Sequence, residues 1–491
     1  MGRRFGGDVV NVVHDTVGLV IGDQRITGTD SRHAHIDPAT GQPNAMVALA
    51  GAAEIDLAVT AAWDAHREWT ALTVDRRRDL LIDLADAVHE HLDELTELNV
   101  RDYAVPVSFA GTAHLLERFL RHFAGYVDKP HGTSTPVSHS FDVNLIEREP
   151  YGVVGVIAPW NGSLVVAGAC VAPALAAGNA VIFKPSELAP LAALRFGELC
   201  LAAGLPPGLV SVLPARAEGA DALVRHPGVR KIHFTGGGET ARAVLTAAAQ
   251  NLTPVVTELG GKSAQIVFAD ADLESAAALA AHQGPLMQSG QSCACASRIL
   301  VHSSVYDAFA AKFLDVIGTA RIGHPLDPAV AFGPVISESA AQRILNVVHQ
   351  AVDERCGELL TGGTRLGGEL SSGYYIAPTV FGTVDNNSTL AQEETFGPVV
   401  SLIRFEDDDA AVRIANDTRY GLNAFVHTRD LVRAHTVARQ LQAGSVWINQ
   451  FSQISPQGPY GGYKQSGSGR TGGLDGLREF QQVKNIRIGM G

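Results

Sequence analysis

Hydrophobic and polar positions along the chain change their spacing near residue 150. Before that point, residues 74–98 place leucine, alanine and valine on one face of a helix with charged residues opposite, which predicts an amphipathic helix. After it, short β-branched runs alternate with runs rich in alanine and leucine. Such alternation is typical of βαβ units, so it predicts an α/β fold with a doubly wound, mostly parallel sheet.

The alternation extends over two successive regions. Between residue 150 and the segment that carries Cys293, we expect strands at 153–158, 180–184, 210–214, 231–234, 254–259 and 264–268, and helices at 164–177, 191–203 and 239–250. After that segment, we expect helices at 305–319 and 338–354 and strands near 375–381, 399–404, 423–427 and 445–449, so that a second α/β domain occupies about 259–450. Residues 451–473, rich in Gly, Ser, Gln and Pro, should form a loop. A final alternating segment, 482–489, predicts a strand at a sheet edge of this chain or of another subunit.

Composition narrows the class of protein. A chain of 491 residues suggests two or three domains. The formal net charge of −13, with no dense run of Lys or Arg, argues against a nucleic-acid partner. The sequence contains no uncharged apolar run of about 18 residues, which argues against a membrane span.

Five cysteines without a disulfide pattern fit a reducing cytoplasm. Arg3 and Arg4 precede an apolar stretch, as in a twin-arginine export signal, but His14 and Asp15 interrupt it and no cleavage site follows.

Three turns that follow predicted strands carry candidate chemistry. In residues 234–242, Gly236, Gly238 and Ala241 match G-x-G-x-x-A, which favours a phosphate at a helix N-terminus, although a plain glycine turn fits equally well. The general Rossmann rule would then make Glu258 the ribose-binding acid. In residues 183–190, a lysine and a glutamate three positions apart could contact a ribose, or the segment could be an ordinary capped helix start.

The third turn, residues 254–263, places Glu258 beside two glycines. A glutamate there could act as a base, because the glycines admit a ligand or another backbone, or it could be a solvated strand end. Cys293 and Cys295 could be two ligands of a metal site, two buried packing residues, or a nucleophile and its neighbour. His282 and His302 complete no zinc signature with them. The polar, turn-forming residues 290–292 favour an exposed nucleophile at Cys293 and a packing role for Cys295, which could trap it as a disulfide on oxidation.

Taken together, the motifs resemble those of the NAD(P)-dependent aldehyde dehydrogenases, in that family's order and near its spacing. The resemblance covers about residues 33–491 and rests on segments 159–161, 173–187, 234–237, 258–263, 290–293, 393–399 and 459–470. It implies a Rossmann-like cofactor domain, a second α/β catalytic domain and a small β oligomerisation flap. The implied boundaries are 1–123 with 147–258 for the NAD-binding domain, 259–450 for the catalytic domain, 451–473 for an active-site loop, and 124–146 with 474–491 for oligomerisation.

The resemblance assigns roles residue by residue. Cys293 would be the nucleophile. Glu258 would be the general base, which replaces the ribose-binding role considered above. The Asn161 amide and the Cys293 backbone N–H would form the oxyanion hole. Cofactor contacts would come from Ile157, Pro159, Trp160, Lys184, Ser186, Glu187, Gly219, Phe234, Thr235, Gly236, Gly237, Leu259, Gly260, Glu394 and Phe396. The substrate pocket would be lined by Gly162, Val165, Val166, Ala169, Met287, Ser292, Phe451, Ile454 and Tyr460, and no metal is implied.

The implied reaction is oxidation of an aldehyde to the acid through a thioester on Cys293, with the chain forming homodimers or homotetramers. Glu258 favours hydrolysis over acyl transfer to coenzyme A, and Glu187 favours NAD over NADP, which stays an alternative. The alternatives are a nucleotide-independent cysteine esterase and a catalytically inactive protein of the same fold. The apolar pocket favours a neutral, fairly bulky aldehyde, aromatic ones included.

The chain departs from the family pattern at several positions. Cys170 and Thr471 stand where many members carry a lysine and a glutamate that help protons leave the general base, so that route is in doubt here and water or backbone carbonyls could replace it. Gly162 and Ser163 replace the usual Phe-Pro, and Ala169 replaces a bulkier residue, which should widen the substrate tunnel. Ala241 replaces a frequent glycine, a change that a helix start tolerates.

Overall fold

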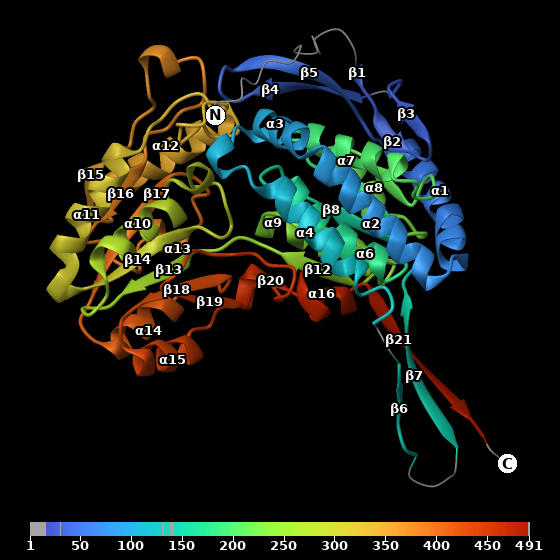
Figure 1. Cartoon of the computed structure of the whole chain (residues 1–491). Coiled ribbons are helices and arrows are strands. Elements are labelled where there is room, and N and C mark those ends of the chain that lie inside the picture. Colours follow the sequence, from blue (N-terminus) through green and yellow to red (C-terminus); the bar gives the residue numbers. More distant parts are fainter. Residues whose placement is uncertain (1–15, 30, 130–131, 138–141, 490–491) are drawn as a thin grey trace.

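A computed structural model describes residues 16–29, 31–129, 132–137 and 142–489 (Figure 1). The described chain forms two α/β halves side by side and an arm that projects from one of them. The sequence features at Arg3, Arg4, His14 and Asp15 lie outside the described residues. Within the described part, no helix is both long and apolar enough to cross a membrane.

The first half is built on an eight-stranded sheet. Its strands, in spatial order, are β20 (Gly467–Ser468), β12 (Val255–Glu258), β11 (Lys231–Thr235), β8 (Val153–Ile157), β9 (Ala180–Lys184), β10 (Val210–Val212), β2 (Leu19–Ile21) and β3 (Gln24–Ile26). The five central strands are parallel, whereas the outer three pair antiparallel with their neighbours. Strands β8 and β9 are buried along their whole length, which explains their continuous apolar sequence.

The second half contains a seven-stranded sheet. Its order is β15 (Glu358–Thr361), β16 (Thr379–Gly382), β17 (Val399–Phe405), β14 (Ala296–His302), β13 (Ser263–Val267), β18 (Asn423–His427) and β19 (Ser445–Ile448). Six strands are parallel and only β15 pairs antiparallel. A three-stranded sheet of β1 (Thr16–Val17), β5 (Gln42–Leu49) and β4 (Ser31–Asp37) crosses the top of the molecule in Figure 1.

Helices cover both sheets. Those of the first half are α1 (Ala52–Ala71), α2 (Val74–Glu90), α3 (Leu92–Tyr103), α4 (Thr112–Ala124), α5 (Ser163–Val166), α6 (Ala172–Ala176), α7 (Leu191–Ala202), α8 (Ala217–Arg225), α9 (Gly238–Ala249) and α16 (Gly473–Arg478). Those of the second half are α10 (Leu273–Gln283), α11 (Tyr306–Thr319), α12 (Glu338–Asp353), α13 (Thr389–Gln392), α14 (Asp408–Asn416) and α15 (Leu431–Gln440). Most predicted elements are therefore found within one or two residues of their expected ends.

Two expectations about helices need correction. Residues 74–98 form two helices, because the backbone at His91 leaves the helical region and its Nδ1 contacts the Ala87 carbonyl at 2.8 Å. The predicted helix at 164–177 is interrupted by five π-helical residues, Ala167–Val171, between α5 and α6. A π-helical turn widens the helix locally and occurs often at functional sites. Cys170 lies in this turn.

The arm is a three-stranded sheet of β21 (Gln481–Ile488), β7 (Val143–Pro150) and β6 (Thr133–Ser134). All eight residues of β21 pair antiparallel with β7, so the predicted C-terminal strand adds to a sheet edge of its own chain. Strand β7 runs across the expected boundary between residues 146 and 147. Figure 1 shows the arm extending away from both halves.

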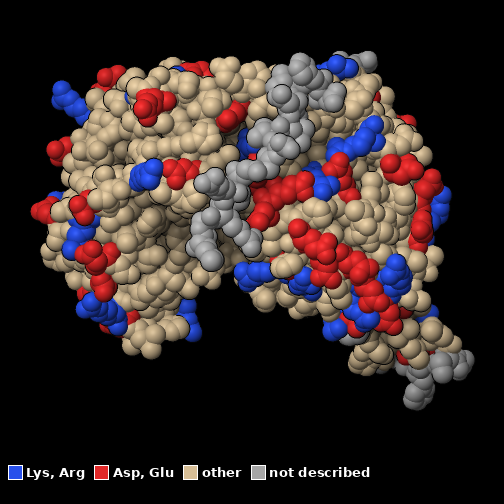
Figure 2. All heavy atoms as spheres, turned by 45° about the horizontal axis from the view of Figure 1, so that its top comes forward, with Lys and Arg blue, Asp and Glu red and all other residues tan. Residues whose placement is uncertain are grey.

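Most charged side chains lie on the molecular surface. On the face shown in Figure 2, acidic side chains gather on the right part, interleaved with basic ones, in keeping with the net charge of −13. Arg298 is an exception, because its side chain is fully buried beside β13 and α14. Its guanidinium donates to the carbonyl oxygens of Lys262, Ile414 and Ala415 and to the Asn386 side chain, at 2.8–3.0 Å.

We expect Arg298→Met to destabilise the fold strongly. The substitution would leave the buried carbonyl groups of Lys262 and Ala415 without this donor, while the Ile414 carbonyl keeps only a longer bond from the Asp417 N–H at 3.3 Å, and each unsatisfied group costs about 1–3 kcal/mol. The free energy of unfolding should fall by roughly 3 kcal/mol or more, measured by urea denaturation. Arg439→Met is the matched control, because Arg439 is exposed on α15 and should change stability little. Equal stability of the two variants would contradict this account of Arg298.

Candidate active site

The carboxyl ends of the central parallel strands bring the candidate residues to one edge of the first sheet. Strand β8 leads to Asn161, β9 ends at Lys184, β11 leads to Gly236, and β12 ends at Glu258. In open α/β sheets, ligands bind beyond this edge because the loops there are free to vary. From the second half, the segment before β14 reaches the same edge, and this segment carries Cys293.

The segment before Cys293 has a constrained backbone. Gln288, Ser289 and Gly290 all have positive φ angles, of 50°, 55° and 70°. A side chain at Gly290 would lie 2.0 Å from the Gly397 carbonyl oxygen, so only glycine fits this approach. The buried Gln291 side chain accepts from the Ile336 backbone N–H at 2.9 Å and donates to the Pro334 carbonyl at 3.4 Å. These contacts fix the direction in which Cys293 projects.

Asn161 connects the first half to this segment. Its Nδ2 donates to the Gln291 carbonyl oxygen at 2.9 Å, across 130 residues of sequence. The amide therefore lies next to the backbone that leads into Cys293. The structure places Asn161 next to the Cys293 segment. From the sequence, these two could be connected only through the family resemblance.

Glu258 is buried at the same junction. Its side chain is 6% exposed, and neither carboxylate oxygen has a hydrogen-bond partner among the described residues. Burial raises the pKa of this carboxyl well above its usual range, while the nearby Arg470 opposes the shift. A side chain at Gly461 would lie 2.7 Å from Glu258 Oε1, so the glycine leaves room for the carboxylate. A carboxylate of raised pKa in a dry site is a strong base once it is ionised.

Cys293 is partly exposed, in contrast to the four other cysteines, which are buried. Burial raises the pKa of its thiol to about 12, and the charges of Glu394 and Glu258 act in the same direction. The Tyr460 side chain and the Cys293 backbone act in the opposite direction and lower this pKa. Because the thiolate is the reactive form, the site has to supply further stabilisation for the negative charge.

Glu394 docks on the two glycines that follow Glu258. It accepts from the Gly261 backbone N–H at 2.9 Å, and a side chain at Gly260 would lie 2.1 Å from its Oε2. Phe396 has a positive φ of 49° and packs edge-on against Trp160, with ring centroids 5.6 Å apart. Both predicted cofactor contacts in this segment therefore border the junction between the halves.

Open space lies beside two glycines at the N-terminus of α9, next to predicted cofactor residues. Around the N-terminus of α9, side chains added at Gly237 and Gly238 would meet no atom within 4 Å. The first amide groups of a helix carry free donors and partial positive charge, which suit a pyrophosphate. Lys184 and Glu187 lie at the end of β9, and burial lowers the pKa of the Lys184 ammonium group while Glu187 opposes the shift. This combination of an open helix N-terminus, a lysine and a carboxylate fits a dinucleotide.

Gly219 has a packing explanation as well. A side chain there would lie 2.4 Å from the Ala50 carbonyl oxygen and 2.7 Å from the Ala215 Cβ. Its contact with the cofactor stays a prediction. The remaining predicted cofactor residues Ile157, Pro159, Trp160, Ser186, Phe234, Thr235, Gly236 and Leu259 lie at or just beyond the ends of β8, β9, β11 and β12.

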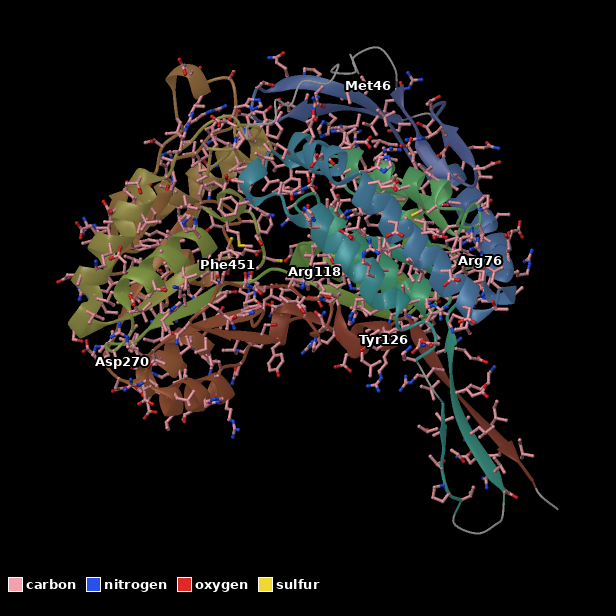
Figure 3. The ribbon with its side chains drawn as sticks, in the orientation of Figure 1. Met46, Arg76, Arg118, Tyr126, Asp270 and Phe451 are labelled. Carbon is pink, nitrogen blue, oxygen red and sulfur yellow. The ribbon has the colours of Figure 1, made fainter. Side chains whose placement is uncertain are left out.

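The predicted substrate residues come from both halves. Gly162, Val165, Val166 and Ala169 lie on or just before α5 and its π-helical turn, whereas Met287 and Ser292 flank the segment that carries Cys293. Phe451, Ile454 and Tyr460 lie on the irregular segment after β19. Figure 3 shows Phe451 on the side of the second half that faces the first. The lining role of these residues stays a prediction.

The departures from the family pattern have distinct surroundings. Cys170 Sγ lies 3.5 Å from His233 Nε2 in a fully buried contact, and burial lowers the pKa of this imidazole to about 3. Thr471 pairs with Tyr460 through two backbone hydrogen bonds of 2.7 and 2.8 Å. Neither residue carries a charge at neutral pH, so neither reproduces a lysine–glutamate pair.

The described residues do not support the hypothesis that Cys293 and Cys295 are two ligands of a metal site. His302 faces Ser304 and Phe405, while His282 packs near Phe109. No group of three or more His, Cys, Asp or Glu residues in the described part of the chain is placed to hold a metal ion. Cys295 is 7% exposed, and its thiol contacts the Met287 carbonyl at 3.7 Å, as expected for a packing residue.

Comparison with known proteins agrees with this geometry. The Aldehyde dehydrogenase family model matches residues 26–486. The chain belongs to the aldehyde dehydrogenase family. The enzyme is 38% identical to a candidate aldehyde dehydrogenase from Burkholderia cenocepacia, with a TM-score of 0.93 over 96% of this chain and 97% of that one.

Two further solved structures are of proteins with a bound dinucleotide. A betaine aldehyde dehydrogenase from Staphylococcus aureus in complex with NAD+ is 33% identical, with a TM-score of 0.93 over 96% of this chain and 95% of that one. The NAD+ complex of an aldehyde dehydrogenase from Bacillus cereus is 32% identical, with a TM-score of 0.95 over 99% of each chain. As a member of this family, the present enzyme is an oxidoreductase that acts on aldehydes.

Sequence reasoning missed several residues that shape the site of this aldehyde dehydrogenase. Gln291 anchors the Cys293 segment, and Arg343 donates to the Thr395 and Phe396 carbonyl oxygens. Asn423, at the start of β18, donates to the Tyr460 hydroxyl at 3.1 Å. An asparagine that opens a predicted buried strand is an unusual signal that could have indicated such a role.

We expect Gly290→Ala to impair the enzyme. The new methyl group would collide with the Gly397 carbonyl at a positive φ, so the Cys293 segment or the Glu394 segment would have to move. Displacement of a reacting group by about 1 Å can cost roughly 100-fold in rate, and we expect a loss of kcat/KM of that order. Gly318→Ala on α11 is the control, since a side chain there meets no atom within 4 Å. Unchanged kinetics for Gly290→Ala would show that the Cys293 segment adapts freely.

Proposed function

We propose that the enzyme oxidises a neutral, fairly bulky aldehyde, aromatic ones included, to the carboxylic acid with NAD, using Cys293 as nucleophile and Glu258 as general base. The observation that carries the proposal is the contact of the Asn161 amide with the backbone before Cys293. It supports an oxyanion hole formed by Asn161 and the Cys293 backbone N–H. The buried, unpaired Glu258 nearby supports a base for hydrolysis.

The first half of the reaction takes place on the Cys293 sulfur. The thiol loses its proton to solvent, and the thiolate attacks the carbonyl carbon to form a thiohemiacetal. Negative charge then grows on the former carbonyl oxygen, where the Asn161 amide and the Cys293 N–H donate to it. One such donor contributes about 3–4 kcal/mol to barrier lowering. When bound, NAD+ supplies the acceptor for the hydrogen and electron pair that leave the aldehyde carbon, and a thioester on Cys293 remains.

The second half needs Glu258. The carboxylate takes a proton from water, the water oxygen bonds to the thioester carbon, and the carbon–sulfur bond breaks to release the acid and the thiolate. The raised pKa of Glu258 makes it an effective proton acceptor. This base favours hydrolysis over acyl transfer to coenzyme A.

The choice of NAD over NADP rests on Glu187. Its carboxylate lies beside Ser186 Oγ, at 3.3 Å, in the turn after β9. A carboxylate near the adenosine ribose accepts hydrogen bonds from hydroxyl groups and repels a 2′-phosphate. NADP should therefore be the poorer cofactor.

The arm supports assembly into dimers or tetramers. Val483 and Ile488 on β21 are 60% and 48% exposed, although both are apolar. Apolar side chains exposed on a projecting sheet are typical of protein–protein contacts. The segments 124–146 and 474–491 would then mediate oligomerisation.

A panel of aliphatic and aromatic aldehydes, each with NAD and with NADP, tests the proposed reaction. We expect the reduced cofactor to form fastest with NAD and bulky neutral aldehydes, measured by absorbance. Cys293→Ala should abolish the signal because the nucleophile is lost, whereas Cys295→Ala should keep most of it. A signal that survives in Cys293→Ala and disappears in Cys295→Ala would overturn the assignment of the nucleophile.

We expect Glu258→Gln to accumulate the acyl-enzyme, because glutamine cannot take the proton from water. The intact protein should gain the mass of the acyl group, while the exposed Glu239→Gln variant on α9 serves as the control. The raised pKa also predicts that wild-type hydrolysis slows as the pH falls through a value well above the usual range of a glutamate, since the base is then protonated. Slow turnover without a mass increment would place Glu258 in another step.

A further inference from the structure

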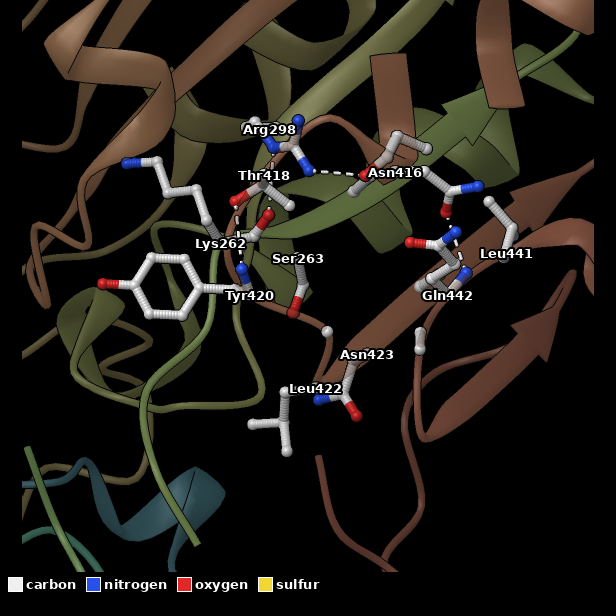
Figure 4. Close-up of a pocket in the computed structure, with 15 residues that line it drawn as sticks. Lys262, Ser263, Arg298, Asn416, Thr418, Tyr420, Leu422, Asn423, Leu441 and Gln442 are labelled. Atoms are coloured by element: carbon white, nitrogen blue, oxygen red, sulfur yellow. Dashed lines mark hydrogen bonds between the residues drawn. The ribbon is translucent and has the colours of Figure 1, made fainter. Parts of the chain in front are cut away.

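Some buried charged groups of the enzyme hold separate segments of the chain together. Arg298 is one of them, because its guanidinium donates to the Lys262 carbonyl oxygen beside a small cavity (Figure 4). Asp102 is another. Its side chain is fully buried near the end of α3, and its carboxylate contacts the start of α7. Since α7 follows the turn that carries Lys184 and Glu187, Asp102 holds the segment that continues from two predicted cofactor residues.

The Asp102 carboxylate caps α7. Its Oδ1 accepts from the Leu191 backbone N–H and its Oδ2 from the Ala192 backbone N–H, both at 2.9 Å. The first N–H groups of a helix have no partner within the helix, and a side chain just before the helix commonly accepts from them. Pro190 is in that position here and forms no such hydrogen bond. The cap of α7 therefore comes from α3, from a residue 89 positions before Leu191.

His35 contacts Asp102 from β4. Its Nε2 lies 3.3 Å from the Asp102 carbonyl oxygen and 3.5 Å from Asp102 Oδ1, and both side chains are fully buried. A backbone carbonyl only accepts, so Nε2 carries a hydrogen and donates. Its Nδ1 contacts the side-chain oxygen of Asn44 on β5, which accepts as well. The ring then has hydrogens on both nitrogens, so it is an imidazolium that faces a carboxylate.

The pairing with His35 keeps the Asp102 carboxylate in its accepting form. Burial raises the pKa of this carboxyl to about 6, while His35 and the two amide groups of α7 oppose the shift. A buried carboxylate is costly unless charged or polar partners compensate it. Without the imidazole the carboxyl would be protonated more readily, and a protonated oxygen is a poorer acceptor for an amide of α7. His35 therefore acts on α7 through Asp102.

The turn between β9 and α7 is attached at both ends. At its start, Ser186 forms a parallel bridge with Ala215, which follows β10. Within the turn, the Ser186 carbonyl accepts from the Ala189 N–H at 3.2 Å. At its end, Asp102 holds the first residues of α7. Glu187 lies between these two attachments, so a shift of α7 would move Glu187 as well.

We propose that Asp102 and His35 are positioning residues that hold residues 184–190 where Lys184 and Glu187 bind the adenosine ribose of the cofactor. The proposal rests on the adenosine contacts of Lys184 and Glu187 in the proposed function. Asp102 acts through α7, and neither it nor His35 touches the cofactor. Loss of either residue should therefore weaken binding of the adenosine half and leave the chemistry at Cys293 intact.

Cofactor binding without aldehyde tests the proposal. The dissociation constants of NAD+ and of AMP, which contains only the adenosine ribose and one phosphate, are measured on the full-length protein by titration calorimetry. In Asp102→Asn one amide of α7 loses its acceptor, and we expect both constants to rise about tenfold because a hydrogen bond to a charged group is lost. His35→Gln keeps a donor without the charge and should raise both constants by a smaller factor. With saturating NAD+ and aldehyde, kcat should stay within about twofold of the wild type in both variants.

Exposed residues of the same types provide matched controls. Asp83→Asn and His89→Gln both change α2, where the two side chains are 53% and 61% exposed. Their dissociation constants should equal those of the wild type. If Asp102→Asn does not fold, His35→Gln carries the same test. Unchanged constants for NAD+ and AMP in His35→Gln, or a loss of kcat with unchanged constants, would overturn the proposal.

A double-mutant cycle with Glu187→Gln separates positioning from a general structural role. If Asp102 acts by placing Glu187, then Asp102→Asn should raise the dissociation constants by a smaller factor in the Glu187→Gln background than in the wild type. Equal factors in the two backgrounds would contradict the proposal. Since no aldehyde enters these measurements, a failure of the proposed oxidation would appear separately, as a wild-type enzyme that binds NAD+ and does not reduce it.

Discussion

The hydrogen bond from the Asn161 amide to the Gln291 carbonyl joins the two halves of the molecule at the place where chemistry is proposed. Asn161 follows a strand of the eight-stranded sheet, and Gln291 precedes a strand of the seven-stranded sheet. Neither half alone contains a nucleophile, an oxyanion donor and a base. The relative position of the two sheets therefore decides whether the three groups can act on one carbonyl carbon.

That junction is buried and brings two carboxyl groups close to Cys293, which is costly for a thiol that has to ionise. Glu258 is buried without a hydrogen-bond partner in the described residues, and Glu394 adds a second carboxylate nearby. Desolvation makes Glu258 a better base and Cys293 a poorer acid at the same time. In the proposed mechanism, neutral donors resolve this conflict, namely the Cys293 backbone N–H and the Asn161 amide. Such donors favour a developing negative charge without pairing permanently with the base.

The sequence predicts the framework well because its central strands are buried on both faces. Strands 180–184 and 423–427 are found with the expected bounds, since continuous apolar runs between turn residues leave little alternative. The helix break at His91 and the π-helical turn around Cys170 were missed, because each depends on one local hydrogen-bond choice that periodicity does not record. The candidate residues Cys293, Glu258 and Asn161 were found through motifs. Asn423 and Gln291 were not, because their partners are distant in sequence and only the folded chain brings them together.

The central claim is that Cys293, Asn161 and Glu258 act on a single carbonyl carbon at the junction of the two halves. The most direct measurement is a crystal structure of the Glu258→Gln variant after exposure to an aldehyde and NAD+. We expect electron density continuous with the Cys293 sulfur, with the acyl oxygen within hydrogen-bonding distance of both the Asn161 amide and the Cys293 backbone N–H. An acyl group attached to Cys295, or an acyl oxygen that points away from Asn161, would contradict the account.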